Sequence, residues 1–249
     1  MPERENILLV AGASSDMGTY LLSYIGDKYD CVIVIYRRMN EELRRCLDSL
    51  NVQKIVEIQA DFTVGADLDR MLEVLDGTPA PTHIVHFPAP VFRNNKFHKM
   101  DWSDFEREID ISLKSFVVIA QTVLPKMVKS KYGRIVMMSS YAVENIPPRY
   151  CSNYVTVKYA MLGLMKALAA EYADKGITVN GVAPSLVETK YMSETPEIII
   201  KRTADSSPLG RNLNPEDVIP AIEFLLSDSA SCINGHNIVI SCGRSSLDS

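Results

Sequence analysis

The sequence lacks every cysteine pattern that would indicate a disulfide framework or a zinc site. Its five cysteines are odd in number and scattered, and none forms a C-x-x-C pair. Such usage is typical of reduced thiols in a cytoplasmic protein. We therefore expect a cytoplasmic location, no metal site, and ordinary core or surface roles for Cys31, Cys46, Cys151, Cys232 and Cys242.

Three further features are missing, and each excludes a class of protein. No run of basic residues is long enough for a nucleic-acid patch, and the net charge is −5, from 26 basic and 31 acidic residues. No uninterrupted apolar stretch approaches the roughly 18 residues of a membrane span. The N-terminal stretch M-P-E-R-E-N lacks the apolar core of a signal peptide. We expect neither a nucleic-acid partner nor a membrane partner.

Strand and helix patterns alternate along the 249 residues. Apolar runs of strand length cover Ile7–Ala11, Cys31–Tyr36, Lys54–Gln59, His83–Phe87, Arg134–Ser139, Thr178–Ala183 and Asn237–Ser241. Helical patterns cover Met17–Lys28, Glu41–Leu50, Asp67–Leu75, Trp102–Val128, Ser152–Lys175 and Pro215–Leu226. Strands that are continuously rich in Val and Ile indicate a sheet covered on both faces. The sequence predicts one domain over residues 1–249, an α/β fold with a doubly wound, Rossmann-type parallel seven-stranded sheet and helices on both faces.

Two segments carry more specific expectations. Asp101 and Asp104 suit the start of the longest helix, and Pro125 permits only about one further turn or a kink. The stretch Leu186–Pro208 has two prolines and weak periodicity, which predicts an irregular insertion at about 186–208. Long ordered insertions of this kind are often lids over a site.

The stretch Val10–Gly18, V-A-G-A-S-S-D-M-G, joins the first strand to the first helix. Gly12 and Gly18 suit the tight turn of a dinucleotide-binding loop, but Asp16 stands where a further glycine is usual. A carboxylate at about 4 Å from a pyrophosphate would be repelled by roughly 1 to 4 kcal/mol, depending on the dielectric. Because aspartate is a preferred N-cap residue, we expect Asp16 to cap the helix and to point away from the phosphates. The loop is then competent to bind the dinucleotide.

Tyr154 and Lys158 are four residues apart in Y-V-T-V-K, so they share one face of a helix. An ordinary phenol has a pKa of about 10 and is a poor acid or base at neutral pH. A neighbouring ammonium stabilises the phenolate and lowers that pKa. Ser140 ends a strand in M-M-S-S and can donate a hydrogen bond to the carbonyl oxygen that Tyr154 would protonate. The spacing alone also fits a solvated helix face, but its place after a serine-ended strand favours an acid–base site.

Further motifs follow in a fixed order: A-D-F at Ala60–Phe62, H-F-P-A at His86–Ala89, I-S-L-K at Ile111–Lys114, G-R-I-V-M-M-S-S at Gly133–Ser140 and V-N-G-V-A-P-S at Val179–Ser185. With these pieces, nearly the whole chain resembles the short-chain dehydrogenase/reductase family, in the branch whose length matches this chain. The segments Ser207–Val218 and Ile233–Ile240 are similar to those of bacterial 3-ketoacyl-carrier-protein reductases and related carbonyl reductases.

The resemblance implies hydride transfer between a nicotinamide cofactor and a carbonyl or alcohol carbon. It implies that Tyr154 is the general acid in reduction, that Lys158 lowers its pKa and holds the nicotinamide ribose, and that Ser140 orients the substrate oxygen. The fourth catalytic position, an asparagine in the family, is Ser112 here. The residues implied to bind the cofactor, together with Tyr154 and Lys158, are Gly12, Ser14, Ser15, Asp16, Met17, Gly18, Arg37, Arg38, Asp61, Phe62, Pro88, Pro184, Val187 and Thr189.

The chain departs from the family pattern near the cofactor. The shorter Ser112 has one donor where asparagine has two, which puts the proton relay from Lys158 to solvent in doubt. H-F-P-A replaces the family's N-N-A-G, with His86 read as a strand-stabilising side chain, and Pro184-Ser185 replaces Pro-Gly. These changes leave an alternative open, a degenerate member that binds nucleotide or protein partners without turnover. Retention of Ser140, Tyr154 and Lys158 argues against it.

The cofactor form, the substrate and the assembly are less closely specified. The second strand ends in Arg37 and Arg38 without an aspartate, which favours NADP(H), with Ser14 as a further donor, over NAD. We expect Phe92, Glu144, Tyr150, Leu186 and Met192 to line a pocket for a ketone, for example a 3-ketoacyl thioester. We also expect a homo-oligomer, a tetramer or a dimer, because the two longest helices carry surplus apolar residues, namely Met161, Leu164, Met165 and Leu168 beside Ala160 and Ala167.

Overall fold

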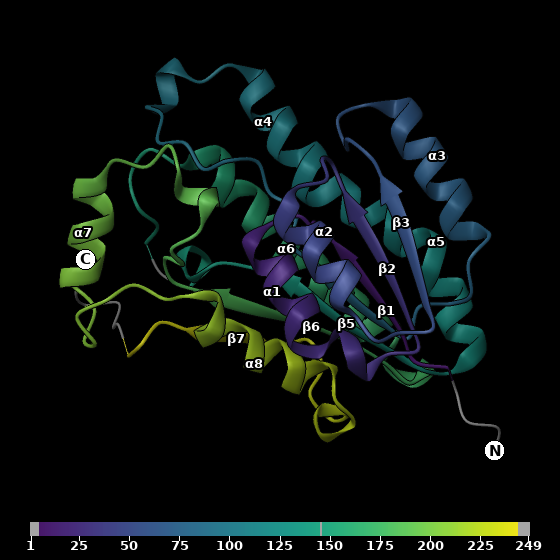
Figure 1. Ribbon diagram of the computed structural model, residues 1–249. Coiled ribbons are helices and arrows are strands. Elements are labelled where there is room, and N and C mark those ends of the chain that lie inside the picture. The colour runs from purple at the N-terminus through teal and green to yellow at the C-terminus, as the bar shows by residue number, and fades with distance from the viewer. Residues whose placement is uncertain (1–4, 145, 244–249) are drawn as a thin grey trace.

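Seven parallel strands form one sheet in the order β3-β2-β1-β4-β5-β6-β7 (Figure 1). The strands are β1 (Ile7–Ala11), β2 (Cys31–Tyr36), β3 (Lys54–Gln59), β4 (His83–His86), β5 (Gly133–Met138), β6 (Ile177–Pro184) and β7 (Asn237–Ile240). The computed structural model describes residues 5–144 and 146–243, so both ends of the expected 1–249 domain, including the first four residues of M-P-E-R-E-N, lie outside the described part. Within it, the predicted doubly wound fold is confirmed.

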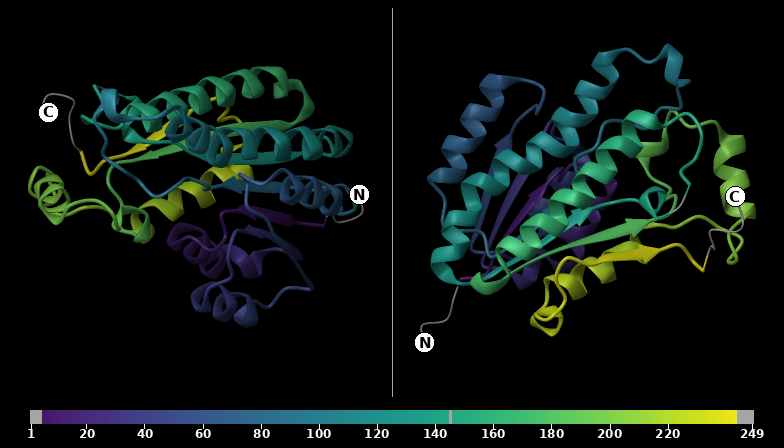
Figure 2. Two further views of the ribbon diagram at one scale, coloured as in Figure 1. Left: turned by 90° about the horizontal axis from the view of Figure 1, so that it is seen from above. Right: turned by 180° about the vertical axis from the view of Figure 1, so that it is seen from behind.

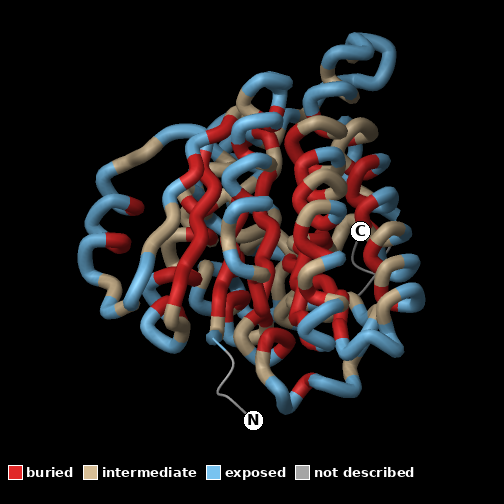
Figure 3. Tube along the Cα trace, turned by 90° about the vertical axis from the view of Figure 1, so that its right-hand side faces the viewer, coloured by how far each residue is buried: buried red, intermediate tan, exposed pale blue. Residues whose placement is uncertain are grey.

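Helices cover both faces of the sheet, and each face has its own apolar core. Helices α1 (Asp16–Ile25), α2 (Glu41–Ser49) and α8 (Pro215–Leu226) lie on one side, and α3 (Gly65–Asp76), α5 (Ser115–Ser130) and α6 (Ser152–Glu171) lie on the other (Figure 2). Neighbouring residues of one strand face opposite cores, because side chains alternate across a sheet. The central strands are therefore buried along their whole length (Figure 3).

The longest predicted helix is divided by a π-helical turn. It consists of α4 (Trp102–Glu108), the π turn Ile109–Lys114, and α5. The Asp101 N–H donates to Asp104 Oδ2 at 3.2 Å, as expected for a capped start. The helix ends at Ser130, about one turn beyond Pro125, with Lys131 in the left-handed conformation. Single π turns inside α-helices are frequent at functional sites, and this one contains Ser112.

By length and composition, the helical stretch Trp102–Ser130 is apolar enough to cross a membrane, and half of its apolar window is buried inside the protein. The sequence analysis considered only uninterrupted apolar runs, of which none is this long, whereas an average over a window tolerates scattered polar residues. Phe116, Ile119, Val123 and Met127 on this helix pack into the core beneath α3 and α6, as in a buried helix of a globular fold.

The segment expected to be irregular contains a helix that sequence reasoning missed. Helix α7 (Glu197–Asp205) lies within Leu186–Pro208 and has no buried residue. Its main apolar feature is a run of three isoleucines, and a short apolar run cannot be assigned to a helix by periodicity alone, which explains the miss. The buried Asn212 holds this segment to the protein, because its Nδ2 donates to Ile200 O at 3.0 Å and to Glu188 Oε1 at 2.9 Å.

Candidate active site

A cavity of about 1430 Å³ opens at the carboxyl ends of the strands. Its walls come from the turn after β1, the end of β2, the loop after β4, the end of β5, helix α6 and the segment after β6. The sheet order reverses between β1 and β4, since β2 and β3 lie on one side of β1 and β4 to β7 on the other. Such a switch point is where open α/β sheets bind ligands.

Most of the predicted site residues lie together in this cavity. Those that line it are Gly12, Ser14, Ser15, Asp16, Met17, Arg37, Asp61, Phe62, Pro88, Ser140, Tyr154, Lys158, Pro184, Val187 and Thr189. Gly18, Arg38 and Ser112 are not among its lining residues. Of the expected substrate pocket, Phe92, Leu186 and Met192 line it. Glu144 and Tyr150 do not, and Glu144 instead accepts a hydrogen bond from Asn237 at 2.7 Å.

The turn after β1 needs glycine at two positions for different reasons. Gly12 has a φ of +77°, and a Cβ there would meet Pro88 N at 3.2 Å and Phe87 Cβ at 3.3 Å. A Cβ on Gly18 would lie 2.5 Å from Gly12 O, so α1 packs directly on the turn. Without side chains at these two positions, the backbone of the turn after β1 is accessible from the cavity. This suits the close approach of a pyrophosphate to a helix N-terminus.

Asp16 does not cap α1, so the expectation from sequence is wrong. The N-cap is Ser15, whose Oγ accepts from Gly18 N at 3.0 Å. Asp16 is the first helical residue, and its Oδ2 accepts from the backbone N–H of Lys190 at 2.6 Å. Its other oxygen lies 3.8 Å from Lys190 Nζ, which also binds Glu42 Oε1 at 2.9 Å. The carboxylate thus joins the cofactor turn to the segment after β6 and, as expected, has a partner other than a phosphate.

Tyr154 lies in the wall of the cavity beside aromatic rings of two other segments. The Phe92 ring meets it edge to face at 5.2 Å between centroids, and Phe92 also lies 6.1 Å from Tyr191. Burial raises the pKa of Tyr154, and the neighbouring hydroxyl groups of Ser140 and Tyr191 oppose that rise only in part. The expected lowering by Lys158 is not found in the protein alone, since the ammonium lies 5.7 Å from the ring centroid and bonds elsewhere. Desolvation outweighs the charge at this distance.

Lys158 is a buried cation at the base of the cavity. Its Nζ donates to Met138 O at 2.8 Å, which holds the side chain at the end of β5, and only 3% of the residue is exposed. Burial lowers its pKa to about 8, against a raising effect of Glu108. His86 at the end of β4 is also buried, with Nε2 at 2.9 Å from Ser115 Oγ. Burial and the charge of Lys158 lower the pKa of His86 to about 3, so it is neutral and structural at neutral pH.

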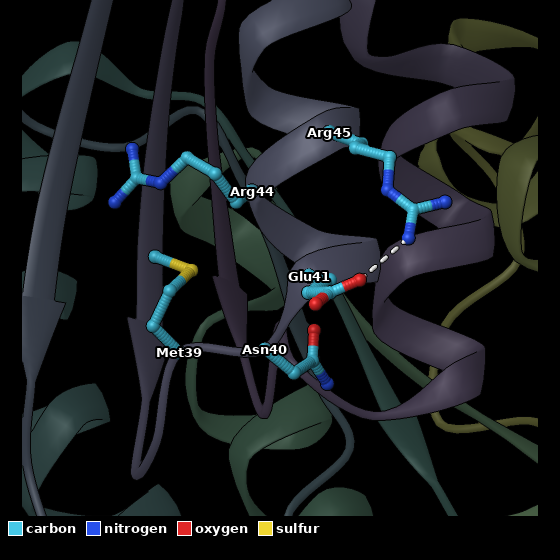
Figure 4. A pocket seen from close by; sticks show the side chains of 5 residues that line it. All are labelled: Met39, Asn40, Glu41, Arg44 and Arg45. Carbon is cyan, nitrogen blue, oxygen red and sulfur yellow. Dashed lines mark hydrogen bonds and ion pairs between the residues drawn. The ribbon is translucent and has the colours of Figure 1, made fainter.

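The arginines near the end of β2 differ in what they face. Arg37 lines the cavity, whereas Arg38 is exposed outside it. A smaller surface hollow of about 440 Å³ lies beside α2, where Arg44 and Arg45 point to opposite sides of the helix (Figure 4). Both are already paired, Arg44 in two hydrogen bonds to Glu57 and Arg45 with Glu41 at 2.8 Å. The cation placed to meet a ligand in the large cavity from this region is therefore Arg37.

The structure adds site residues that the sequence analysis did not select. Tyr191 has a buried hydroxyl beside Tyr154 that makes no hydrogen bond of ordinary geometry with the described residues. Asn40, the N-cap of α2, donates through Nδ2 to Ser14 O at 2.9 Å and braces the cofactor turn. Glu108 is buried near Lys158. Asn40 could have been found from its helix-capping position, but nothing local in the sequence marks the other two.

Comparison with known proteins identifies the family. A family model described as enoyl-(acyl carrier protein) reductase, of the short-chain dehydrogenase type, matches residues 29–245. The chain belongs to the short-chain dehydrogenase/reductase family. It is thus an oxidoreductase of a family that uses nicotinamide cofactors, acts on small molecules and commonly forms oligomers.

Relatives within this family carry several names. Oxidoreductase UcpA of Salmonella typhimurium is 30% identical over 94% of this chain and 92% of its own length. The 3-oxoacyl-[acyl-carrier-protein] reductase FabG of Rickettsia prowazekii is also 30% identical, over 94% of this chain and 95% of its own length. Levodione reductase has the same fold, with a TM-score of 0.85 at 19% identity and 96% coverage of both chains. A short-chain dehydrogenase/reductase of Mycobacterium ulcerans superposes with a TM-score of 0.84 at 24% identity, over 98% of this chain and 91% of that one.

Proposed function

We propose that this protein is an NADP(H)-dependent oxidoreductase that transfers hydride between the nicotinamide and a carbonyl or alcohol carbon. The observation that carries the proposal is the convergence of Ser140, Tyr154 and Lys158 on the cavity that also contains the glycine turn. Three separate segments supply these groups, after β5 and along α6 for the triad and after β1 for the turn. A cofactor bound by the turn would place its reactive end at the triad.

The residues present fit a dinucleotide. The open backbone at Gly12 and the N-terminus of α1 suit the pyrophosphate, with Ser14, Ser15, Asp16 and Met17 around it, and Gly18 packs α1 on the turn. Asp61, Phe62, Pro88, Pro184, Val187 and Thr189 line the remaining length of the cavity. When bound, the nicotinamide supplies the hydride.

The protein's own side chains supply the proton transferred in the reaction. In reduction, Tyr154 gives its phenolic proton to the substrate oxygen while Ser140 donates a second hydrogen bond to the same atom. The elevated pKa of Tyr154 in the protein alone means that it is present as the phenol, the form that a general acid requires. Lys158, fixed by Met138 O, stabilises the phenolate that forms. Ser112 lies outside the cavity wall with its Oγ buried, so any role it has is indirect.

The preference for NADP(H) rests on Arg37. Arg37 lines the cavity at the carboxyl end of β2, where members that prefer NAD carry an acid. Its guanidinium would pair with the 2′-phosphate, and Ser14 would donate to it. Arg38 is directed away from the cavity lining and is the weaker candidate for that contact.

The substrate we propose is a 3-ketoacyl thioester or a related ketone. The cavity wall includes the apolar side chains of Phe92, Ile146, Met192 and Ile199, beside polar ones such as Arg149 and Arg202. Relatives named 3-oxoacyl-[acyl-carrier-protein] reductase support this class, as does levodione reductase for ketones in general. The experiment is to follow NADPH absorbance on mixing with 3-ketoacyl thioesters and simple ketones. Oxidation of NADPH with a ketone supports the proposal. Binding of NADPH without oxidation across the panel would favour a nucleotide-binding member without turnover.

We further propose a single domain over residues 1–249, a cytoplasmic location and a homo-oligomer. The free and scattered cysteines support a reducing compartment. The apolar argument for the oligomer is weaker than the sequence suggested, because Met161 and Met165 are covered by the protein's own core and Leu164 and Leu168 are partly covered. The exposed Tyr159 and Ala160 on α6, with Ala167, remain to pair across a two-fold axis.

A further inference from the structure

Glu108 is a buried carboxyl group that the chemistry described so far does not use. It is the last residue of α4, it is 4% exposed, and its Oε2 has no hydrogen-bond partner among residues 5–144 and 146–243. An unpaired carboxylate in such a place is unfavourable, because burial removes the water that would solvate its charge. Buried acids without a direct partner cluster at functional sites, where their proton affinity is matched to a task.

Its surroundings place Glu108 in the same electrostatic cluster as the triad. Lys158 lowers the pKa of Glu108, and Glu108 raises the pKa of Lys158, of Tyr154 and of Tyr191. These groups come from α4, α6 and the segment after β6, so the acid lies where three elements meet. Its own neighbour Arg107 also lowers its pKa. Burial outweighs both cations and raises the pKa of Glu108 to about 7.

Two geometric facts connect Glu108 to the cavity. Arg107 and Ile111, one residue before and three residues after Glu108, both line the cavity, whereas the buried Glu108 does not. Ser112 follows Glu108 by four residues, on the same side of the helix. Its Oγ is fully buried and likewise has no partner within the described residues. The helix that carries these two orphaned polar atoms packs against α6, which carries the buried Lys158 ammonium, and such polar groups are the partners that a bridging water needs.

We propose that Glu108 returns the proton to Lys158 after Tyr154 has given its own to the substrate. The inference rests on the proposed function. In reduction the Tyr154 O–H bond breaks and its proton goes to the substrate oxygen. The Tyr154 phenolate then takes a proton from the Lys158 ammonium across a bridging water, and the neutral Lys158 amine takes one from the Glu108 carboxyl across a second, because Glu108 Oε2 has no direct partner among the described residues. The Glu108 carboxylate is reprotonated from solvent at the cavity mouth beside Arg107. These steps are proton transfers, and none of the groups is oxidised or reduced.

In this scheme Glu108 acts through Lys158 and not on the substrate. It accounts for how the chain works without the family's asparagine, whose position holds Ser112. The titratable groups that interact with Glu108 are Lys158, Tyr154 and Tyr191, together with Arg107 on its own helix. The neutral His86 interacts with Lys158. The protonated carboxyl group of Glu108 supplies the proton that reduction consumes. The rate of ketone reduction should therefore fall as the pH rises through about 7, and alcohol oxidation should rise through the same range.

The test compares Glu108→Gln with Glu106→Gln, an exposed glutamate on the same helix. Glutamine keeps the shape of the protonated acid but cannot exchange its proton. We expect Glu108→Gln to lower kcat about tenfold, less than the 10² to 10⁴ of a direct acid–base group. The KM and NADPH affinity should not change, and Glu106→Gln should behave as wild type. A kcat of Glu108→Gln close to that of wild type overturns the inference while leaving the proposed function intact.

A second measurement needs no turnover. Infrared difference spectra across neutral pH should contain the carboxylic C=O band of Glu108, absent in Glu108→Gln and present in Tyr154→Phe. If no such band titrates near neutral pH, Glu108 is not a proton store and the inference fails. A wild type that reduces no ketone overturns the proposed function and this inference together. Should Glu108→Gln fold poorly, Glu108→Leu, which removes the buried polar group, must show the same loss of the band and the same fall in kcat.

Discussion

Replacing Asp16 with alanine should loosen the segment 186–208 from the cofactor turn. The carboxylate is the acceptor for the Lys190 backbone N–H at 2.6 Å and lies 3.8 Å from Lys190 Nζ. Alanine removes both contacts and is tolerated in the first turn of a helix. Glu42→Gln is the matched control, because it weakens only the exposed pairing of Lys190 Nζ and leaves the backbone hydrogen bond in place.

The free energy lost in Asp16→Ala can be estimated from the exposure of the two side chains. A hydrogen bond to a charged group contributes about 1.5–3 kcal/mol, and an exposed ion pair contributes roughly 0–1 kcal/mol. The Asp16 side chain is 29% exposed and that of Lys190 is 68% exposed, so the ion pair adds little. Because the site is partly exposed, we take the lower part of the hydrogen-bond range, about 1.5–2 kcal/mol in total, which corresponds to a shift of roughly 10-fold to 30-fold in the docking equilibrium of the segment.

Amide hydrogen exchange measures this shift directly. In Asp16→Ala, exchange at Lys190 and its neighbours should accelerate by that factor, while peptides of the buried strand β1 serve as an unchanged internal reference. Glu42→Gln should resemble wild type. NADPH binding should weaken in Asp16→Ala, because Val187 and Thr189 in the loosened segment line the cavity. Unchanged exchange in Asp16→Ala would refute the reasoning.

Four further outcomes are expected. Tyr154→Phe should reduce the rate of ketone reduction by about 10² to 10⁴ with NADPH affinity nearly intact; activity near that of wild type on a confirmed substrate would remove its role as the acid. Arg37→Ala should weaken NADPH binding by about 1.5–3 kcal/mol and leave NADH nearly unaffected, and Arg38→Ala should do neither; equal losses for both cofactors in Arg37→Ala would contradict contact with the 2′-phosphate. His86 has a lowered pKa, so the stability that it contributes is present above its ordinary value of 6.5 and is lost as the pH falls toward about 3, by at most about 1.4 kcal/mol per pH unit; urea unfolding of His86→Leu against wild type should show a flatter acid limb, and parallel curves would count against this assignment. Light scattering should give an oligomeric mass at micromolar concentration, whereas a monomer would contradict pairing through α6.

The strands could be predicted closely from sequence, and for all but the edge strands β3 and β7 the reason is burial. β1, β2 and β3 have the predicted bounds, and the other four differ by one residue at one or both ends. The sequence of a parallel strand that is covered on both faces is an unbroken apolar run, which ends where the chain leaves the core. α7 shows the converse. It has no buried residue and only a short run of three isoleucines, so periodicity did not reveal it.

The site could be predicted where a motif and a fold position coincide, as at Gly12, Ser140, Tyr154 and Lys158. Contacts between residues far apart in the sequence could not be predicted. Asp16 is paired with Lys190, 174 residues away, so a local rule about helix capping pointed to the wrong partner. Glu108 has the sequence surroundings of an ordinary polar helix position, between Arg107 and Ile109, and only the packing of α4 against α6 buries it. Its proton affinity is a property of that tertiary contact.

The transfer of deuteride tests the central claim most directly. NADPH carrying deuterium at nicotinamide C4 would be incubated with the panel of ketones and the wild-type protein, and the products analysed by mass spectrometry. The account predicts an alcohol that carries the deuterium on its carbinol carbon, formed by wild type and largely lost in Tyr154→Phe, with NADPH bound by both. Tight NADPH binding with no deuterated alcohol from any ketone would contradict it.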